Sequence, residues 1–367
     1  MKWVGMSSCW RGRMACIATS TDCNCMMGKA IEVMLRAALE RHFNRIWYQR
    51  PQPPLIYRWL SAVYAGLGRS RFRRPLARPP VPVIVVGNLT VGGGGKTPLI
   101  MALCRQLSAR GHAVAVVSRG YGGRHRGQAL SVSAGMDPAL CGDEAVMIAE
   151  STGLPVWVCR RRSRALQAAV DGGAQVVLSD DGLQHAALPR SFEICLIDGK
   201  RGLGNGWLLP AGPLRQPSER LDLVDRVLVK GDGRSDVEAL RLYQRVVGVA
   251  RLDGGVASPL QDWHGQAVDA VCGIANPKAF LDSLRELGMT VRAHVFPDHH
   301  PYRRADLANL SGPVITTAKD AVKLRRLDLE LSIHVLEVEL TLPPALTDEI
   351  ERHLADWGLA REDEQHD

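Results

Sequence analysis

Residues 81–98 read VPVIVVGNLTVGGGGKTP, and this stretch decides the fold of the chain. Val83 to Val86 form a continuous run of apolar, β-branched residues, which is typical of a strand covered on both faces in a parallel sheet. The four glycines that follow have no Cβ atom, so their backbone can adopt φ > 0 and turn its N–H groups towards an anion. The next residues have helical spacing, which places a helix N-terminus at the same point. The stretch therefore predicts a phosphate-binding loop.

The residues after the glycines fit nucleotide chemistry. In such a loop Lys96 reaches the β- and γ-phosphates, and the Thr97 hydroxyl ligates Mg²⁺. Thr90 stands where the strict G-x-x-x-x-G-K-[ST] pattern has glycine, and the alternative is a glycine-rich turn with an incidental Lys-Thr. Strand, glycines, Lys-Thr and helix nevertheless occur in the required order. We therefore expect the nucleotide to be bound by Gly92, Gly93, Gly94, Gly95, Lys96 and Thr97.

Composition and charge narrow the class of protein. The chain has 367 residues, of which 46% are hydrophobic and 23% charged, as in an ordinary globular α/β protein of about two domains. Its formal net charge of +8 suggests an anionic partner. Nine arginines and no acidic residue lie between Arg41 and Pro80. The positive charge is therefore concentrated near one end.

The nine cysteines do not form a disulfide pattern. Five of them lie mostly in apolar runs and are expected to be buried, reduced thiols: Cys104, Cys141, Cys159, Cys195 and Cys272. The other four crowd residues 9–25, where no second paired cluster supports a zinc site. Residues 1–27 fit neither a signal peptide nor a packed element, so we expect disorder or an over-extended reading frame there.

Two amphipathic helices are expected between residues 30 and 68. The second, LIYRWLSAVYAGLG, carries Leu55, Trp59 and Val63 on one face and is followed by an arginine-rich segment. No window reaches the roughly 20 apolar residues that cross a bilayer. The pattern fits a helix that lies in the headgroup region and is held there by arginine. A helix packed on its own domain, with a solvated basic tail, is the alternative.

The rest of the chain alternates strands and helices, which predicts a doubly wound parallel sheet with ligands at the carboxyl ends of its strands. A smaller α/β unit follows, in which Asn276 caps a helix that has Pro277 at its first position. The expected regions are 1–29, an extension; 30–78, membrane-associated helices; 79–225, a phosphate-loop domain; 226–252, a two-strand linker; 253–345, the smaller α/β domain; and 346–367, a helix and acidic tail.

Carboxylates and histidines mark the candidate chemistry. Asp180 and Asp181 end an apolar strand, where an acid can hold Mg²⁺, although they could also cap the next turn. Asp143 and Glu144 precede a helix, where capping is the structural alternative. FPDHHPY, residues 296–302, supplies histidines on a loop. An Asp-His pair that meets across domains is suited to removing a proton from a hydroxyl acceptor.

Seven motifs together resemble those of a known family. GNLTVGGGGKTP, SRGYGG, GDEA, SDDGLQH, GNGWLLPAGPLRQP, FPDHHPY and TAKDAVK occur in this order. In order and spacing they closely resemble the tetraacyldisaccharide 4′-kinases, the lipid A kinases of Gram-negative bacteria. The resemblance runs from about Ala30 to about Leu359. It implies a P-loop NTPase-like fold and ATP-dependent phosphorylation of the 4′-hydroxyl of a tetraacylated glucosamine disaccharide 1-phosphate at the cytoplasmic face of the inner membrane.

The resemblance also implies roles for individual residues. Asp143 and His299 would be the catalytic pair; His300 competes with His299, which is preferred because it directly follows Asp298. Thr97, Asp180, Asp181 and Glu144 would lie on the Mg²⁺ side. Arg119 and Tyr121 would face the sugar or its 1-phosphate, and His185 is either a substrate contact or a hydrogen-bonded loop residue. The implied cofactors are ATP and Mg²⁺, and the implied partners are the lipid A precursor and the inner-membrane surface, without nucleic acid or an oligomer.

The sequence departs from the family pattern at two positions, and it leaves two rival functions to be considered. Gln216 stands where the family usually has glutamate, and Ala318 where it often has glutamate.

A P-loop GTPase or an ATP-dependent ligase would have a similar loop, and TAKD at residues 317–320 is the nearest match to a guanine-reading element. A non-catalytic membrane-surface or RNA-binding protein would use the basic segment but would not need Asp143, Asp180 and His299.

Overall fold

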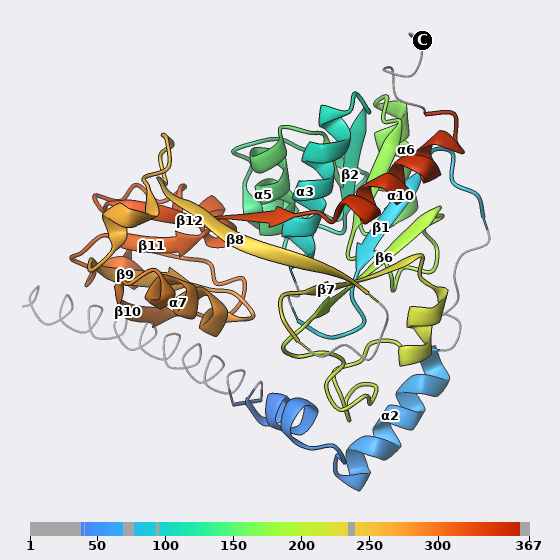
Figure 1. Ribbon diagram of the computed structural model, residues 1–367, viewed down its shortest axis with the longest axis horizontal. Helices are drawn as coiled ribbons and strands as arrows, with labels where there is room; N and C mark the ends of the chain where they lie inside the picture. Colours follow the sequence, from blue (N-terminus) through green and yellow to red (C-terminus); the bar gives the residue numbers. More distant parts are fainter. Residues whose placement is uncertain (1–37, 40, 69–76, 93–94, 234–238, 360–367) are drawn as a thin grey trace, which may run out of the picture.

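The computed structural model describes residues 38–39, 41–68, 77–92, 95–233 and 239–359 (Figure 1). Within these residues, one sheet of 12 strands has the order β10-β9-β11-β12-β8-β7-β6-β1-β5-β2-β4-β3. Its strands are β1 (Val83–Gly87), β2 (Val114–Ser118), β3 (Leu130–Val132), β4 (Val156–Val158), β5 (Val176–Asp180), β6 (Phe192–Asp198), β7 (Arg226–Lys230), β8 (Leu240–Arg251), β9 (Ala267–Cys272), β10 (Thr290–Val295), β11 (Val314–Thr317) and β12 (Ile333–Thr341). The helices are α2 (Leu55–Gly68), α3 (Lys96–Ala109), α4 (Pro138–Cys141), α5 (Asp143–Thr152), α6 (Arg162–Asp171), α7 (Pro277–Glu286), α8 (Arg304–Leu307), α9 (Ala318–Leu324) and α10 (Pro344–Ala355), with 3₁₀ turns at Ser218–Leu223 and Leu260–Trp263.

The central strand β1 explains why the sheet is covered on both faces. All five of its residues are buried, and it pairs in parallel with β5 on one side and β6 on the other. Successive side chains point to opposite faces. Ile84 and Val86 pack towards α3, α5 and α10, whereas Val83 and Val85 pack towards α6. The expected α/β fold, with a glycine-rich loop after the carboxyl end of a buried strand, is therefore confirmed.

A smaller group of strands, β9 to β11, extends the sheet at one end (Figure 1). The long strands β8 and β12 connect the two parts of the sheet. Residues 240–242 of β8 pair in parallel with β7, and most of the remainder pairs with β12 in antiparallel register. Asn276 caps α7 through its side chain, which accepts from the Ala279 N–H, and Pro277 is the first helical residue, as expected.

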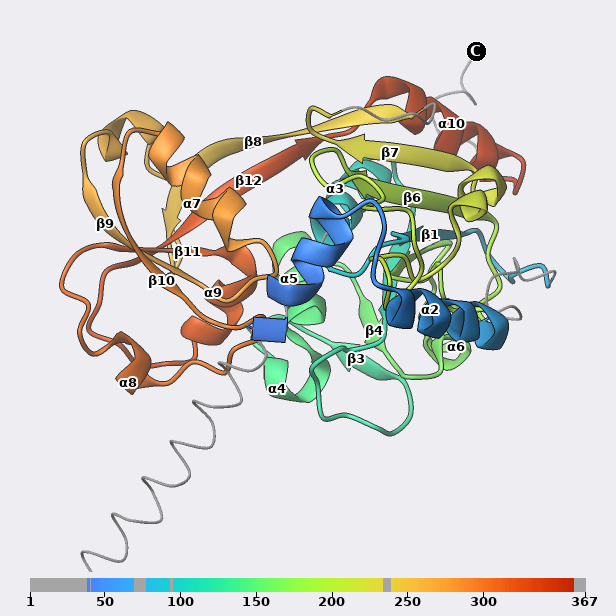
Figure 2. The same cartoon turned by 90° about the horizontal axis from the view of Figure 1, so that it is seen from below.

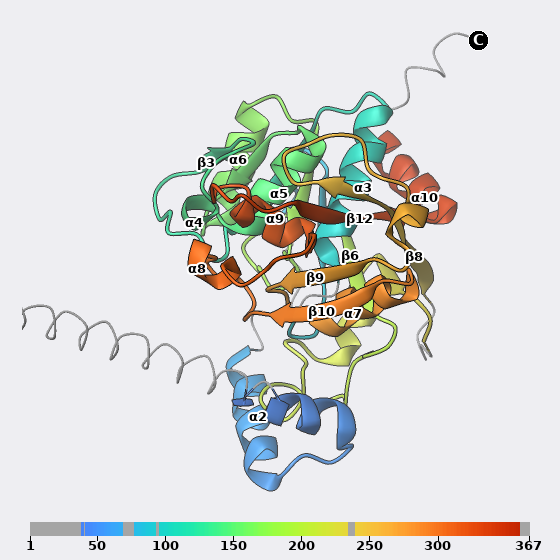
Figure 3. The ribbon, with the colours of Figure 1, turned by 90° about the vertical axis from the view of Figure 1, so that its left-hand side faces the viewer.

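The N-terminal helices lie below the sheet, against the loop of residues 203–216 (Figure 3). The first covers residues 41–49, and α2 follows after two prolines. The Ser61 hydroxyl donates to the Leu208 carbonyl at 3.0 Å, and the Tyr64 hydroxyl donates to the Arg215 carbonyl at 3.0 Å. These contacts fix which face of α2 turns inward. No helix in the described ranges is both long enough and apolar enough to span a membrane.

The structure adds elements that the sequence did not suggest. The short edge strand β3 pairs in antiparallel register with β4, and Ala318–Leu324 forms the short helix α9 with Thr317 as its N-cap. The expected burial of the free thiols is confirmed for Cys104, Cys141, Cys159, Cys195 and Cys272. Residues 1–29, the four N-terminal cysteines and the acidic tail after residue 359 lie outside the described residues.

Candidate active site

The candidate phosphate loop joins β1 to α3. Gly95 is the N-cap of α3 and has φ 90°, and Gly92 has φ 108°; both lie in the left-handed region that favours glycine. Gly93 and Gly94 lie outside the described residues. Because Gly95 supplies no side-chain acceptor, the first N–H groups of α3 can donate to an anion, helped by the helix dipole. The buried Thr97 lies in this first turn.

Lys96 and Asp181 form the centre of a network of charges. Nζ of Lys96 lies 3.0 Å from Asn88 Oδ1 and 3.2 Å from Asp181 Oδ1. Nη1 of Arg215 lies 3.0 and 3.3 Å from the two carboxylate oxygens of Asp181. Burial raises the pKa of Asp181, but the charges of Lys96 and Arg215 outweigh it and lower the pKa to about 2. Asp181 therefore remains ionised and holds Lys96 beside the loop.

Asp180 has a different environment, although it is the preceding residue. It ends β5, is 3% exposed, and its Oδ1 has no hydrogen-bond partner among the described residues. Burial, and then the negative charges of Glu144 and Asp181, raise its pKa to about 7. Nη2 of Arg162 donates to the Asp180 backbone carbonyl at 2.7 Å. An unpaired buried carboxylate beside other acids is stabilised by a bound cation.

Asp143 and His299 meet, although 156 residues separate them in the sequence. Asp143 is the first residue of α5, after the N-cap Gly142, and His299 lies in the loop after β10 with φ 62°. Nδ1 of His299 lies 2.9 and 3.0 Å from the carboxylate oxygens of Asp143. Burial alone would raise the pKa of Asp143 and lower that of His299, but their contact reverses both shifts. The Asp143 carboxylate thus stabilises the imidazolium that forms when the neutral ring of His299 accepts a proton.

Helix α9 brings two lysines to this pair, and it lies beside α5 (Figure 2). Nζ of Lys319 lies 3.3 Å from His299 Nε2, and it also contacts Glu144 Oε1 at 3.2 Å and Asp298 Oδ1 at 3.1 Å. Burial lowers the pKa of Lys319, but the surrounding acids raise it by more. Nζ of Lys323 lies 3.5 Å from Asp143 Oδ2. The arrangement provides a proton acceptor and positive charge at one place, as phosphoryl transfer requires.

Two alternatives from the sequence are decided by their contacts. His300 pairs with Asp306, with Nε2 3.0 Å from Oδ2, and not with Asp143. Asp320 of the TAKD stretch is buried and accepts from the Gly273 N–H at 2.9 Å and the Thr317 hydroxyl at 2.8 Å. This carboxylate has a structural role, so the stretch does not have the geometry of a guanine-reading element.

The expected substrate residues are spread around the site. The ring of Tyr121 is 65% exposed and lies 5.1 Å from the ring of His299. Arg119 is exposed at the end of β2. His185 is half-buried; burial, and then the charge of Arg162, lower its pKa, and its backbone carbonyl accepts from Arg190. The structure therefore brings Tyr121 to the Asp143–His299 pair, while His185 has the surroundings of a neutral loop histidine.

Several residues of the site were not singled out from the sequence. They are Asn88, Arg162, Gln184, Arg215, Lys319 and Lys323. All of them except Arg162 lie inside the motifs quoted above, which was the available signal. Gln216, where the family usually has glutamate, is buried and accepts from Gln184 Nε2 at 3.2 Å. Arg162 had no signal, because its role depends on reaching the end of β5 from α6.

The donor set fits Mg²⁺ better than a transition metal. In the described parts of the chain no group of three or more His, Cys, Asp and Glu side chains could hold a metal ion by itself. Mg²⁺ is usually held by one or two carboxylates together with substrate phosphates and water. The orphaned oxygen of Asp180, on which the charge of Glu144 acts, fits that mode. Asp181 is already occupied by Lys96 and Arg215.

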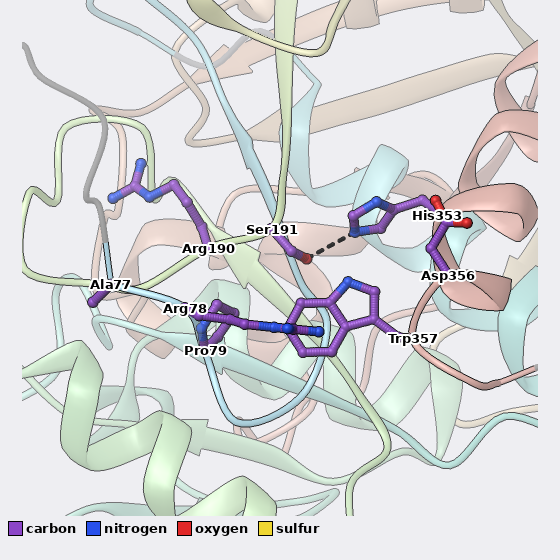
Figure 4. A pocket seen from close by; sticks show the side chains of 8 residues that line it. All are labelled: Ala77, Arg78, Pro79, Arg190, Ser191, His353, Asp356 and Trp357. Atoms are coloured by element: carbon purple, nitrogen blue, oxygen red, sulfur yellow. Dashed lines mark hydrogen bonds between the residues drawn. The ribbon is translucent and has the colours of Figure 1, made fainter.

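A hollow elsewhere in the structure is separate from this site (Figure 4). It has a volume of about 370 Å³ and is lined by residues that include Arg78, Ser191 and Trp357. Ser191 contacts Val83, the first residue of β1, so the hollow lies at the amino ends of the strands. The phosphate loop follows their carboxyl ends. The hollow therefore lies away from the candidate phosphate loop.

A family model, curated relatives and a solved structure match this chain to the same family. A family model described as tetraacyldisaccharide-1-P 4′-kinase matches residues 54–355. A tetraacyldisaccharide 4′-kinase from Alcanivorax borkumensis is 47% identical over 285 residues, which are 76% of this chain and 86% of that protein. One from Alkalilimnicola ehrlichii is 44% identical over 319 residues, 84% of this chain and 96% of the relative. The crystal structure of LpxK from Aquifex aeolicus in complex with ATP superposes with a TM-score of 0.67 at 26% identity, covering 80% of this chain and 97% of that one.

Proposed function

The chain belongs to the tetraacyldisaccharide-1-P 4′-kinase family, and on that premise we propose that Asp143 and His299 together accept the proton of the acceptor hydroxyl. The chain is an ATP-dependent kinase that phosphorylates the 4′-hydroxyl of a tetraacylated glucosamine disaccharide 1-phosphate in lipid A biosynthesis. The single observation that carries the proposal is the contact between His299 Nδ1 and the Asp143 carboxylate.

The reaction forms one bond and breaks another. The 4′-oxygen attacks the γ-phosphorus of ATP, the bond to the β-phosphate oxygen breaks, and ADP leaves. The hydroxyl proton passes to the Asp143–His299 pair, whose imidazolium form is favoured by the raised pKa of His299. Asp143 orients the ring and balances its charge. Tyr121, whose ring packs beside His299, restricts where the sugar can approach.

We assign the phosphates of ATP to Gly92 through Thr97. The N–H groups at the start of α3 bind phosphate oxygens, and the Lys96 ammonium offsets the charge that develops during transfer. Lys96 is held near this position by Asn88 and Asp181. Lys319, which contacts Glu144 and Asp298, adds a second positive charge on the acceptor side.

Mg²⁺ is assigned to Thr97, Asp180, Asp181 and Glu144. Asp180 is the strongest candidate, because its orphaned oxygen and raised pKa both indicate an unmet need for a cation. The ion would offset the charge of the nucleotide's phosphates. The contacts of Asp181 with Lys96 and Arg215 support a role in orienting these cations more than in direct ligation.

The lipid substrate requires the site to work at a membrane surface, and we assign that contact to α2. One face of α2 is exposed and apolar: Leu55, Ile56, Trp59, Val63 and Leu67 are 76, 63, 65, 43 and 79% exposed. The opposite face is tied to the 203–216 loop through Ser61 and Tyr64. An apolar face of this kind, beside arginines, is suited to an anionic bilayer surface. The enzyme would thus dock peripherally on the cytoplasmic face of the inner membrane.

The remaining assignments concern the sugar and the domains. Arg119, Tyr121 and His185 are proposed to face the disaccharide or its 1-phosphate, and Arg119 is the exposed cation among them. The boundaries 79–225 and 253–345 are proposed for the kinase domain and the smaller domain. Separate apolar cores on the two faces of β9 to β11 support the second unit.

The test compares Asp143→Asn and His299→Gln with His300→Gln as the matched control. Loss of the proton acceptor should lower kcat by about 100-fold or more, while the Kd for ATP changes little, because neither residue belongs to the phosphate loop. His300→Gln should keep most of kcat, because His300 pairs with Asp306. Equal losses in all three variants, or loss of ATP binding in Asp143→Asn, would refute the assignment.

A further inference from the structure

Lys230 is a lysine at the phosphate loop that neither the sequence motifs nor the mechanism above uses. It is the last residue of β7, so it lies at the same carboxyl edge of the sheet as the loop. A Cβ atom on Gly95 would lie only 3.0 Å from Cδ and 3.1 Å from Nζ of Lys230. The ammonium group is therefore packed directly against the N-cap of α3. A side chain at position 95 would crowd Lys230, and the φ of 90° there also favours glycine.

The surroundings of Lys230 lack a partner for its charge. In the described part of the chain it takes part in no side-chain hydrogen bond or ion pair within contact distance. Asp198 is the acid whose charge acts on it, but Asp198 Oδ1 already accepts from the backbone N–H groups of Lys200 and Arg201. Burial lowers the pKa of Lys230. An ammonium group held in a partly buried position without an acceptor is most stable when an anion occupies the adjacent loop.

The position of Lys230 indicates which part of the nucleotide it meets. In the sheet, β7 and β6 lie on one side of β1, whereas β5 with Asp180 lies on the other. Asp143 enters from α5, which packs against β4 on that second side. The γ-phosphate must point towards these acids for transfer. The diphosphate that remains in ADP therefore lies nearer to β6 and β7.

We propose that Lys230 is a further nucleotide-binding residue of this kinase, with its ammonium group contacting the α- and β-phosphates of ATP. The proposal rests on the nucleotide site at Gly92 to Thr97. Lys96 and Lys230 then approach the phosphates from opposite sides of the loop. Lys230 contributes to binding in the substrate and product complexes alike, because the phosphates it contacts are present in both.

The experiment measures the Kd for ATP and for ADP by titration calorimetry, together with kcat and the KM for ATP, in the full chain. The variants are Lys230→Met and Lys230→Arg, with Lys200→Met as the matched control. Lys200 is an exposed lysine of the adjacent loop, so replacing it with methionine removes the same charge without affecting the contact with Gly95. Loss of a charge-assisted contact should weaken ATP and ADP equally, by about 10-fold. The KM for ATP should rise with little change in kcat, Lys230→Arg should recover most of the affinity, and Lys200→Met should bind normally.

Three results would overturn the inference. One is unchanged affinity for both nucleotides in Lys230→Met, and another is a loss for ATP alone, which would place Lys230 at the γ-phosphate. The third is an equal loss in Lys200→Met, which would indicate a general effect of charge. Absence of ATP binding in the unmodified chain would instead refute the nucleotide site itself, so the two failures are distinguishable. Thermal unfolding of each variant checks that the fold is retained.

Discussion

The exposed face of α2 leads to a prediction about membrane binding. Leu55, Trp59 and Leu67 leave 76, 65 and 79% of their surface exposed, and all three project away from the contacts of Ser61 and Tyr64 with the 203–216 loop. We expect the variant Leu55→Gln, Trp59→Gln, Leu67→Gln to lose most of its membrane binding. Glutamine is a good helix former, so the helix itself should persist.

The magnitude follows from the area removed from water. Burying one apolar side chain fully contributes about 1.5–3 kcal/mol, so the exposed parts of these three, equivalent to about two side chains, contribute about 3–6 kcal/mol. A loss of about 3 kcal/mol already lowers a partition coefficient by about 100-fold. The arginines of residues 41–58 remain in the variant, so residual binding should depend strongly on salt.

The assay is cosedimentation with vesicles of mixed phosphatidylethanolamine and phosphatidylglycerol, followed by lipid-kinase kinetics. The control is Val256→Gln, an apolar residue that is 97% exposed on the loop between β8 and β9. The triple variant should partition at least about 100-fold more weakly and show a higher KM for lipid with an unchanged KM for ATP. Partitioning equal to that of Val256→Gln would refute the assignment of the membrane contact to α2.

Three further predictions concern other charged residues. Arg215→Met should lower kcat by about 10-fold or more, because Asp181, which holds Lys96, loses its second cationic partner. Arg245→Met, whose pair with Glu339 is exposed, should be neutral in the same assay. Asp180→Ala should raise the Mg²⁺ concentration for half-maximal activity by about 10-fold or more, and an unchanged requirement would remove Asp180 from the ligand set. Burial raises the pKa of Asp269, but the hydrogen bonds from His294 and Gly312 and the charge of Arg292 lower it by more. The ionised Asp269 therefore stabilises the fold fully above its unfolded pKa, which is near 4. This stabilisation is lost as the pH falls through the lower pKa of the folded state. Asp269→Asn should therefore cost about 1–3 kcal/mol in urea unfolding at pH 7 and less at pH 3, and an equal cost at both would contradict this sign.

Local sequence patterns were sufficient to predict the strands and helices in which they occur. The run Val83 to Val86 has only apolar, β-branched residues, and it forms the fully buried strand β1. Asn276 and Pro277 are the cap and first residue of α7 because a side-chain acceptor and a fixed φ favour a helix start. In contrast, β3 is a three-residue edge strand, and α9 has only seven residues. Elements this short contain too little periodicity to be identified before their neighbours are known.

In the candidate site, too, individual residues could be predicted from the sequence, whereas the contacts between them could not. Asp143, Asp180, Asp181 and His299 were expected because they stand at the ends of strands or in recognisable motifs. Their pairing is a property of the fold, since the contact between Asp143 and His299 depends on α9 and the β10 loop packing against α5. Lys230 had no motif, and its position depends on β7 lying two strands from β1. Contacts between distant segments were therefore the part that the sequence could not provide.

The most direct test of the account is transfer of labelled γ-phosphate from ATP to a tetraacyl disaccharide 1-phosphate in mixed micelles. It should be run with the unmodified chain, Lys96→Ala and Asp143→Asn at saturating ATP. The account predicts a 4′-phosphorylated lipid from the unmodified chain and almost none from either variant, with ATP still bound by Asp143→Asn. Hydrolysis of ATP without a lipid product, or full transfer by Asp143→Asn, would contradict it.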